Sequence, residues 1–293
     1  MNHILQEDIE YIAMSKSIEW KELENKSVLV TGATGLIGSQ IIMALDEHNK
    51  SNKNPITIYA YARNEEKARK KFEDCTTYVK IVMGDICDDI KIDKPIDYII
   101  HGASITGSKQ FVDCPVETIM TGIEGTKNIL EFAREKQIKG MVYLSSLEVY
   151  GVTDFSLKSV KEDQYGYIEQ LSPRSSYSEG KRMIECMCVS YGSEYGVPVK
   201  IVRLSQTFGP GVSYEDGRVF AQFARAAIEN KNIVLKTKGE TYRNYCYTRD
   251  AVIGILCVLL KGEKREAYNI ANEETGISIC DMARLVAEDI KKR

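Results

Sequence analysis

The chain has 293 residues and a formal net charge of −3, and 43% of its residues are hydrophobic and 28% charged. This length suffices for one large domain or two lobes with a real core, and the composition is typical of soluble globular proteins. The charge balance supplies no basic footprint, which argues against nucleic acid as a partner.

The first 25 residues precede the first predicted strand and mix acidic with apolar side chains. They lack the basic start and apolar core of a signal peptide, and no apolar run in the chain reaches membrane-spanning length. We therefore predict a helical extension over residues 1–25 that packs on the main domain, with Ile9, Ile12 and Trp20 as its anchors.

The eight cysteines include no CxxC pair, and most lie in apolar runs. This usage is typical of reduced, mostly buried thiols and predicts a cytoplasmic protein. The one close pair, Cys186 and Cys188, lies on a helical pattern with no nearby histidine, so no metal site is expected.

From residue 26 to 204, short β-branched runs alternate with helical patterns. Most of these runs are apolar on both faces, as buried parallel strands are. The alternation predicts an α/β fold with a doubly wound parallel sheet. The predicted strands cover 27–30, 56–61, 78–83, 97–101, 140–145 and 199–204, and the predicted helices cover 36–48, 64–73, 115–137 and 177–195.

The first strand runs into the segment TGATGLIG, which opens a helix. Gly32, Gly35 and Gly38 allow a tight turn, a close backbone approach to a pyrophosphate and close packing of helix on strand. The free N–H groups at the helix start, at Leu36, Ile37 and Gly38, suit phosphates. A plain strand–helix turn is the alternative, but the place after the first strand of a βαβ pattern predicts a Rossmann-type dinucleotide site.

The second and third strands end in residues that would face the adenosine half of the dinucleotide. The second strand ends at Arg63 without the acidic residue that holds the ribose. Arg63 would accept a 2′-phosphate and favour NADP over NAD, or it is a solvated surface arginine. Asp85 and Ile86 end the third strand, and Asp85 is placed to accept a hydrogen bond from the adenine amino group.

The fourth strand ends in the segment His101-Gly-Ala103-Ser104, which would pass beneath the cofactor. We interpret His101 as a strand-end histidine bonded to backbone rather than a catalytic group, and Ala103 as a cofactor contact.

Tyr177 and Lys181 share one face of a predicted helix because they are four residues apart. Lys181 can then lower the pKa of the phenol, which needs that help to act as a base near neutral pH, and can hold the nicotinamide ribose. Ser146 ends the fifth strand, at the sheet edge where ligands bind, and could hydrogen-bond the reacting hydroxyl. A surface Tyr–Lys pair is the alternative interpretation.

After about residue 205 the strand–helix pattern weakens. We expect a smaller lobe over 205–293 that is interleaved with the Rossmann core of 26–204. Its predicted elements are a helix at 218–230, a strand at 233–236, a helix at 249–261, a strand at 267–271 and a helix at 278–290.

These motifs together carry a resemblance that covers about residues 26 to 290. TGATGLIG, GDI, HGAS, SSLEVYG, SPRSSYSEGK, TFGP, EDGR and TYRNYCYTRD occur in this order. The order resembles that of extended short-chain dehydrogenases that act on nucleotide sugars. The second half is most similar to UDP-glucuronate decarboxylase (UDP-xylose synthase). The resemblance implies an NAD(P)-dependent enzyme of polysaccharide biosynthesis that oxidises a nucleotide sugar at C4, with the smaller lobe binding the substrate.

The resemblance also implies roles for the catalytic group. Tyr177 would be the base, Lys181 its partner and Ser146 a hydroxyl relay. Glu148 stands where the decarboxylases carry a catalytic glutamate, and Arg243 where they carry an arginine that faces the sugar carboxylate. From the residues alone, Glu148 could equally be a solvated loop acid and Arg243 a stacked structural residue.

Other positions concern substrate contacts and departures from the family pattern. Arg218 lies in the segment that contacts the nucleotide half of the substrate, and Gln206 replaces an asparagine linked to phosphate contacts. Leu147 replaces a polar residue, which in the 4,6-dehydratases is an aspartic acid, and an apolar side chain cannot serve as a general acid. Gly122 replaces an asparagine near the cofactor. Relatives usually continue past the last helix, so an incomplete substrate lobe is expected.

Several reactions follow the same first oxidation. We expect a decarboxylase, and a 4-epimerase, a 4,6-dehydratase and a keto-sugar reductase remain as alternatives. A dinucleotide-sensing scaffold without catalysis is a further class, which the intact set of Ser146, Tyr177 and Lys181 argues against.

We also expect a homodimer, because dimers in this family commonly bury the two matching helices in a four-helix bundle. The helices at 115–137 and 177–195 carry the apolar stripes Ile119, Ile123 and Ile129, and Met183, Met187 and Tyr191. The alternative is that these stripes face only their own sheet.

Overall fold

A parallel sheet forms the centre of the protein, whose computed structural model describes residues 2–154 and 156–291. Seven of the strands in these residues make up this sheet, in the order β10-β6-β5-β4-β1-β2-β3, and all neighbours are parallel. The fold is therefore α/β and doubly wound, as predicted. The strands are β1 (Ser27–Thr31), β2 (Thr57–Ala62), β3 (Val79–Met83), β4 (Tyr98–His101), β5 (Gly140–Ser146), β6 (Val199–Leu204) and β10 (Ala267–Ile270).

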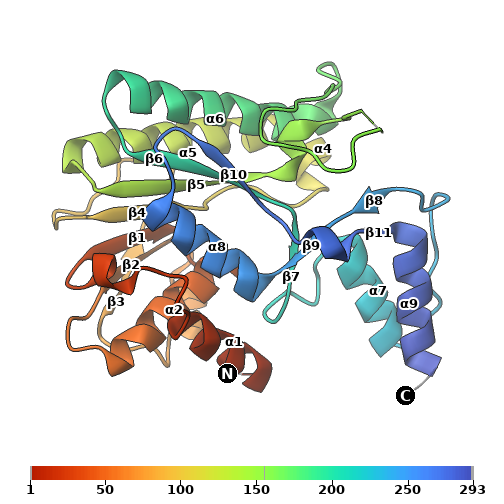
Figure 1. Cartoon of the computed structure of the whole chain (residues 1–293), viewed down its shortest axis with the longest axis horizontal. Helices are drawn as coiled ribbons and strands as arrows, with labels where there is room; N and C mark the ends of the chain where they lie inside the picture. The colour runs from red at the N-terminus through yellow and green to blue at the C-terminus, as the bar shows by residue number, and fades with distance from the viewer. Residues whose placement is uncertain (1, 155, 292–293) are drawn as a thin grey trace.

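Helices cover both faces of the sheet (Figure 1). On one face α5 (Pro115–Lys136) and α6 (Ser176–Glu194) lie side by side, and on the other α2 (Leu36–Ser51) packs beside α8 (Thr248–Lys261). The two layers explain the continuous apolar strands. Val28 and Val30 lie in the core under α2 and α8, whereas Leu29 lies in the core under α5 and α6.

Local sequence sets the bounds of α5. Pro115 occupies its first turn, where a missing N–H costs nothing. Gln137 follows its last residue in the left-handed conformation, and its N–H bonds back to Ala133 and Arg134. The short helix α4 (Gln110–Asp113) precedes α5, and α3 (Glu65–Lys71) connects β2 to β3. Asn64 caps α3 by accepting a hydrogen bond from the Lys67 N–H.

Residues 2–25 contain helix α1 (His3–Ala13), which packs against α2 and α8, and the 3-10 turn η1 (Trp20–Leu23), which joins the same core. Ile9 and Ile12 are fully buried there. Trp20 is half-buried and stacks on His48 of α2 at a centroid distance of 3.9 Å. Asp8 is also buried, at 3% exposure, where its carboxylate accepts a hydrogen bond from the Tyr247 hydroxyl.

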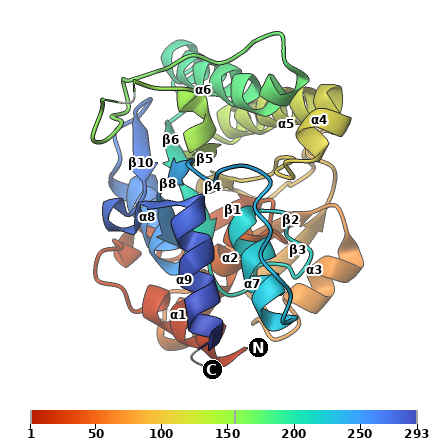
Figure 2. The same ribbon diagram turned by 90° about the vertical axis from the view of Figure 1, so that its right-hand side faces the viewer.

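A smaller unit follows β6 at the end of the sheet (Figure 2). Two short strand pairs, β7 with β9 in parallel and β8 with β11 antiparallel, support helices α7 and α9, which pack against each other. Between β9 and β11 the chain returns to the main unit, where α8 packs on the sheet and β10 joins its edge, so the two units are interleaved. The elements of the smaller unit are β7 (Gln206–Phe208), α7 (Val219–Ile228), β8 (Tyr242–Arg243), β9 (Tyr245–Tyr247), η4 (Glu273–Thr275), β11 (Ile277–Ser278) and α9 (Ile279–Lys291).

Two sequence expectations are wrong in detail. Residues 233–236 form no strand; Ile233 and Leu235 instead pack without ladder pairing against the apolar core between α7 and α9. The thiols are not mostly buried. Cys188 and Cys246 are buried, Cys114 and Cys186 are exposed and the other four are intermediate, and all eight are free.

Within the described residues, no helix has the length and apolar character needed to cross a membrane.

Candidate active site

Two glycines of the turn between β1 and α2 leave no room for a side chain. Gly32 has a φ of +67°, and a Cβ there would lie 2.7 Å from the carbonyl of Gly102. A Cβ on Gly38 would lie 2.4 Å from the Gly32 carbonyl oxygen. A Cβ on Gly35 would meet only that oxygen, at 3.1 Å, so its other side is open. No side chain caps α2 and no acid lies in its first turn, which leaves its first N–H groups free for an anion.

The ends of β2 and β3 bring Arg63 and Asp85 together. The guanidinium Nη1 lies 3.5 Å from the carboxylate, and the Arg63 side chain remains 68% exposed. The Cys87 N–H bonds the same carboxylate at 3.0 Å, and this bond and Arg63 hold the pKa of Asp85 below its usual value. Ile86 is buried and its carbonyl accepts a hydrogen bond from Asn128, so its side chain is core.

His101 at the end of β4 is a buried structural residue with both ring nitrogens hydrogen-bonded. Its ring nitrogens lie 2.7 Å from the Thr31 hydroxyl and 3.0 Å from the Thr126 hydroxyl. The Thr31 oxygen accepts hydrogen bonds from the N–H groups of Gly102 and Ala103, so its own proton points to His101. His101 thus bonds threonine side chains rather than the backbone expected from the sequence. The Ala103 N–H is already satisfied within the protein.

Tyr177 is the second residue of α6. Its ring stacks flat on that of Phe111 in α4, with the ring centroids 4.3 Å apart. Burial raises the pKa of its phenol to about 12, and the nearby Ser146 hydroxyl acts in the opposite direction. Ser146 ends β5 and accepts a hydrogen bond from the Glu148 N–H. The end of β5 and the start of α6 therefore meet.

Lys181 lies one turn further along α6 and is 4% exposed. Its ammonium donates to the Leu144 carbonyl at 2.7 Å and lies 5.6 Å from the centre of the Tyr177 ring. Burial lowers the pKa of Lys181 to about 8. The Tyr–Lys spacing predicts a lowered pKa for Tyr177. Without a bound ligand the opposite holds, because burial raises the pKa of this phenol.

Glu148 lies in the 3-10 turn η2 (Leu147–Tyr150) directly after β5. One carboxylate oxygen accepts a hydrogen bond from Arg174 at 2.9 Å and the other from the Ser178 hydroxyl at 2.9 Å. The negative charge of Glu148 reaches Tyr177, whose pKa it raises, while Arg174 lowers it. Glu148 is therefore a fixed neighbour of the Tyr177 phenol rather than a solvated loop acid.

Gln206, Arg218 and Arg243 lie in the smaller unit. Arg218 precedes α7, where its guanidinium binds the Asp216 carboxylate at 2.7 Å and the Thr207 carbonyl at 2.8 Å. Gln206 begins β7 and is half-buried. Arg243 is exposed on β8 and donates to the carbonyl of Tyr242. Within the described residues, Arg243 makes no hydrogen bond or ion pair with Ser146, Tyr177 or Lys181.

Three residues at this site were missed by the sequence analysis. Arg174 precedes Tyr177 by three residues in the motif SPRSSY, lies 4.9 Å from the centre of the Phe111 ring and binds Glu148. Ser178 follows Tyr177 directly. The position of Arg174 three residues before Tyr177 is a local signal for Arg174, but no local pattern marks Phe111. In residues 2–154 and 156–291, no group of three or more His, Cys, Asp or Glu side chains could hold a metal ion.

Comparisons with known proteins agree with this architecture. A model of the NAD dependent epimerase/dehydratase family matches residues 28–271. UDP-glucuronic acid decarboxylase 1 of Xenopus tropicalis is 29% identical over 269 residues, which are 91% of this chain and 61% of that protein. Human dTDP-D-glucose 4,6-dehydratase is 29% identical over 279 residues, 91% of this chain and 75% of that one. The UDP-glucose 4-epimerase of Thermotoga maritima, solved with UDP-glucose, shares the fold with a TM-score of 0.75 and 22% identity, over 89% of this chain and 82% of its own.

Proposed function

Because the chain belongs to the NAD dependent epimerase/dehydratase family, we propose that it modifies a nucleotide sugar, oxidising it at C4, and that its reaction is the decarboxylation of UDP-glucuronate. The observation that carries this proposal is the placement of Glu148, whose carboxylate is fixed by Arg174 and Ser178 beside Tyr177.

The glycine turn fits a dinucleotide. The open side of Gly35 and the uncapped start of α2 form a cradle where a pyrophosphate can meet the N–H groups of Leu36, Ile37 and Gly38. NAD, when bound, supplies the acceptor for the hydride that leaves C4 and returns it at the end of the cycle. Asp85 would receive the adenine amino group and Lys181 the nicotinamide ribose. Ala103 would contribute an apolar contact, whereas the buried Ile86 would support the strand end from the core.

Tyr177 would take the proton of the C4 hydroxyl as the hydride leaves. In the protein alone burial keeps the phenol protonated near neutral pH, so that proton must be released before Tyr177, as the phenolate, can accept the one from the sugar. The neighbouring Ser146 hydroxyl would relay the proton to and from the sugar oxygen. Lys181 keeps its charge close by, 5.6 Å from the ring centre, and favours the phenolate.

The resulting 4-keto group makes C5 the carbon next to a carbonyl. The bond from C5 to the carboxylate can then break, since its electron pair moves toward the ketone and CO2 leaves. Glu148 would hold the proton that returns to C5, and Arg174 fixes the carboxylate of Glu148 for this step. Arg243, Arg218 and Gln206 would bind the substrate, with Arg243 at the sugar carboxylate, because a guanidinium matches a carboxylate with two parallel bonds.

Leu147, beside Glu148, disfavours the 4,6-dehydratase reaction, which needs a proton donor at that position. Arg243 is exposed and donates to the Tyr242 carbonyl, which favours a second candidate, a 4-epimerase. The sugar of a 4-epimerase substrate has no carboxylate, so such an enzyme needs no arginine to bind one. In that reaction the 4-keto sugar would turn over before the hydride returns.

The reaction is tested by incubating the purified chain with NAD and UDP-glucuronate. We expect release of CO2 and a UDP-pentose by mass spectrometry, with no net change in nicotinamide absorbance. Arg243→Lys keeps the charge but loses the paired bonds, so by calorimetry it should weaken binding of the uronate more than binding of neutral UDP-glucose. C4 epimers that interconvert without change in mass would instead identify an epimerase.

For the cofactor, we propose NAD, with NADP as the alternative that Arg63 offers. Arg63 is only weakly tethered by Asp85 at 3.5 Å and is 68% exposed, so its guanidinium is free to meet a 2′-phosphate. Calorimetric titration with both dinucleotides decides between them. If Arg63→Ala weakens NADP binding and leaves NAD binding unchanged, Arg63 reads the phosphate.

We further propose that the chain forms a homodimer through α5 and α6. Met120 and Met183 on these helices are 41% and 58% exposed, and Val116 is 64% exposed. Ile129, by contrast, is fully buried against the sheet of its own chain, so only part of the predicted stripes is available to a partner.

A further inference from the structure

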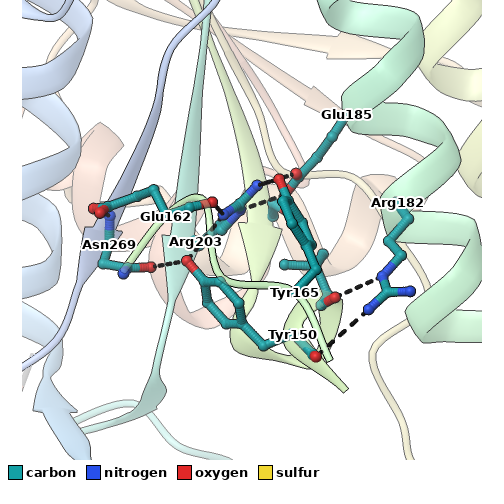
Figure 3. Close-up of polar contacts among 9 residues, drawn as sticks. Tyr150, Glu162, Tyr165, Arg182, Glu185, Arg203 and Asn269 are labelled. Atoms are coloured by element: carbon teal, nitrogen blue, oxygen red, sulfur yellow. Dashed lines mark hydrogen bonds and ion pairs between the residues drawn. The ribbon is translucent and has the colours of Figure 1, made fainter. Parts of the chain in front are cut away.

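Arg203 and Glu185 form a buried ion pair between β6 and α6, and the proposed chemistry uses neither residue. The Arg203 side chain on β6 is 2% exposed and the Glu185 side chain on α6 is 8% exposed. Two guanidinium nitrogens donate to the two carboxylate oxygens, at 2.7 and 3.1 Å. Figure 3 shows the pair at the centre of a set of polar contacts that reaches several elements.

Glu185 connects the pair to β5 and α6. Its carboxylate accepts a hydrogen bond from the Ser145 hydroxyl at 2.5 Å, and Ser145 is the neighbour of Ser146 in the strand. Glu185 also lies one helical turn after Lys181 on α6. The position of this single carboxylate therefore depends on both elements that carry Ser146 and Lys181.

Arg203 connects the pair to η2 and to the loop that follows it. Its Nη1 donates to the Tyr150 hydroxyl at 2.9 Å and to the Glu162 carbonyl at 2.7 Å, and its Nη2 donates to the Tyr165 hydroxyl. Tyr150 in turn donates to the amide oxygen of Asn269 on β10 at 2.6 Å. Tyr150 ends the turn that contains Glu148, so Arg203 fixes the second half of that turn.

The elements that carry the catalytic group thus meet at one buried pair. We propose that Arg203 and Glu185 are positioning residues, which hold β5, η2 and α6 in register so that Ser146, Glu148 and the Tyr177–Lys181 pair face one substrate. This inference rests on the proposed use of the site and adds two residues that touch no substrate.

Glu185 has an electrostatic as well as a geometric effect. Its negative charge raises the pKa of Lys181, which burial lowers to about 8. The other ionisable groups that face Lys181 are neutral over the working range or act less strongly; they are Tyr177 and Cys188 on α6, Tyr143 on β5 and His101 on β4. The charge on Lys181 near neutral pH therefore depends on Glu185.

The charge effect is tested without any substrate. In protein labelled with 13C-lysine, the NMR titration of Lys181, assigned by its absence in Lys181→Met, reports its pKa. Glu185→Gln keeps the shape of the side chain and removes the charge, and we expect the pKa of Lys181 to fall by about one unit or more. An unchanged pKa in Glu185→Gln would overturn the proposal.

The geometric effect is tested with Arg203→Lys, which keeps the charge but loses the fork that bonds Tyr150, Glu162 and Tyr165 together. We expect faster deuterium exchange in residues 160–167 and an unchanged Lys181 titration. With UDP-glucuronate, kcat should fall by about tenfold or more while KM changes little, because the loss concerns alignment rather than binding. Unaltered exchange and kcat would refute the positioning role.

Loss of one buried charge could also unfold the protein, so a paired replacement is needed. Glu185→Leu with Arg203→Met replaces the pair by apolar side chains, which commonly restores stability. We expect a folded protein whose Lys181 pKa stays low. Asp8→Asn serves as the control, because Asp8 is a similarly buried carboxylate with tyrosine and arginine partners away from α6. If Asp8→Asn shifts Lys181 as much as Glu185→Gln, the proposal is wrong. Failure of wild-type turnover on UDP-glucuronate would refute the proposed function alone, since the NMR titration and deuterium exchange need no substrate.

Discussion

At the scale of single residues, the phenol of Tyr177 is the group on which the proposed chemistry depends. Tyr177→Phe keeps the ring and its stacking on Phe111 and removes the proton acceptor. We expect turnover of UDP-glucuronate to fall by about 10²–10⁴-fold, with NAD binding by calorimetry nearly unchanged. Tyr195→Phe, a change at a tyrosine that is 45% exposed, is the matched control and should leave turnover as it is. Near wild-type activity of Tyr177→Phe would remove this residue from the mechanism.

His101 makes the stability of the fold dependent on pH. Burial, followed by the charge of Lys181, lowers the pKa of His101 to about 3, whereas the unfolded chain has the ordinary value near 6.5. The unfolded state therefore binds a proton between pH 6.5 and 3 that the folded state does not. The stabilising contribution is full above pH 6.5 and is lost as the pH falls through this window.

This dependence is measurable by urea unfolding between pH 7.5 and 4.5. We expect the free energy of unfolding of the wild type to fall by about 1.4 kcal/mol more per pH unit below pH 6 than that of His101→Gln. Gln cannot titrate but can still bond the hydroxyls of Thr31 and Thr126. Parallel pH profiles for the two proteins would show that His101 does not carry the effect.

Which site residues could be predicted depends on how local their contacts are. Tyr177 and Lys181 share one helix, so their spacing alone places them together. The partners of Glu148, in contrast, come from η3 (Pro173–Ser175) and α6, and only the folded loop between them decides that they meet. Arg63 was predicted as a phosphate ligand or a solvated residue, but its pairing with Asp85 follows from the register of β2 and β3.

At the scale of elements, helix α1 is attached to the start of α8 by one buried carboxylate. Asp8 accepts the Tyr247 hydroxyl at 2.7 Å and lies 3.6 Å from the Arg249 guanidinium. Asp8→Asn keeps an acceptor for Tyr247 but removes the charge that Arg249 faces. We expect a loss of about 1–3 kcal/mol in the free energy of unfolding, measured in urea.

Asp250→Asn is the matched control for this change. Asp250 also pairs with Arg249, at 3.3 Å, but its side chain is 53% exposed. Asp250→Asn should lower the free energy of unfolding by less than about 1 kcal/mol, because exposed ion pairs contribute little to stability. Equal losses in both variants would mean that the burial of Asp8 adds nothing to the attachment of α1.

The elements differ in how far the sequence predicts them. Most strands of the main sheet are apolar on both faces and bounded by turns, and their predicted positions are within a residue or two of those observed. The segment 233–236 has the same composition but finds no partner strand, because a strand is defined by its neighbour as well as by its own residues. The short strands β7, β8 and β9 depend on distant partners and leave no pattern that could have predicted them.

At the scale of the whole molecule, the proposed dimer is open to a direct measurement. Light scattering at micromolar concentration should give twice the mass of the chain. Met183→Glu places a charge in the exposed part of α6 and should give the mass of the monomer, since an unpaired charge in an apolar interface is costly. Met14→Glu, at a methionine that is 73% exposed outside these helices, should leave the dimer intact. A monomeric wild type would rule the dimer out.

The late return of the chain to the sheet bears on how the protein is made. During synthesis from the amino terminus, β6 emerges from the ribosome before the smaller unit, while its outer neighbour β10 follows only after β7, α7, β8, β9 and α8. Until then β6 presents an open edge to other nascent chains, and such edges promote aggregation. The Asn269 side chain on β10 also completes the contacts around Tyr150, so the polar network of the site closes only at this stage. Folding of the catalytic half is therefore expected to finish late in translation, at the point where chaperones have the most to protect.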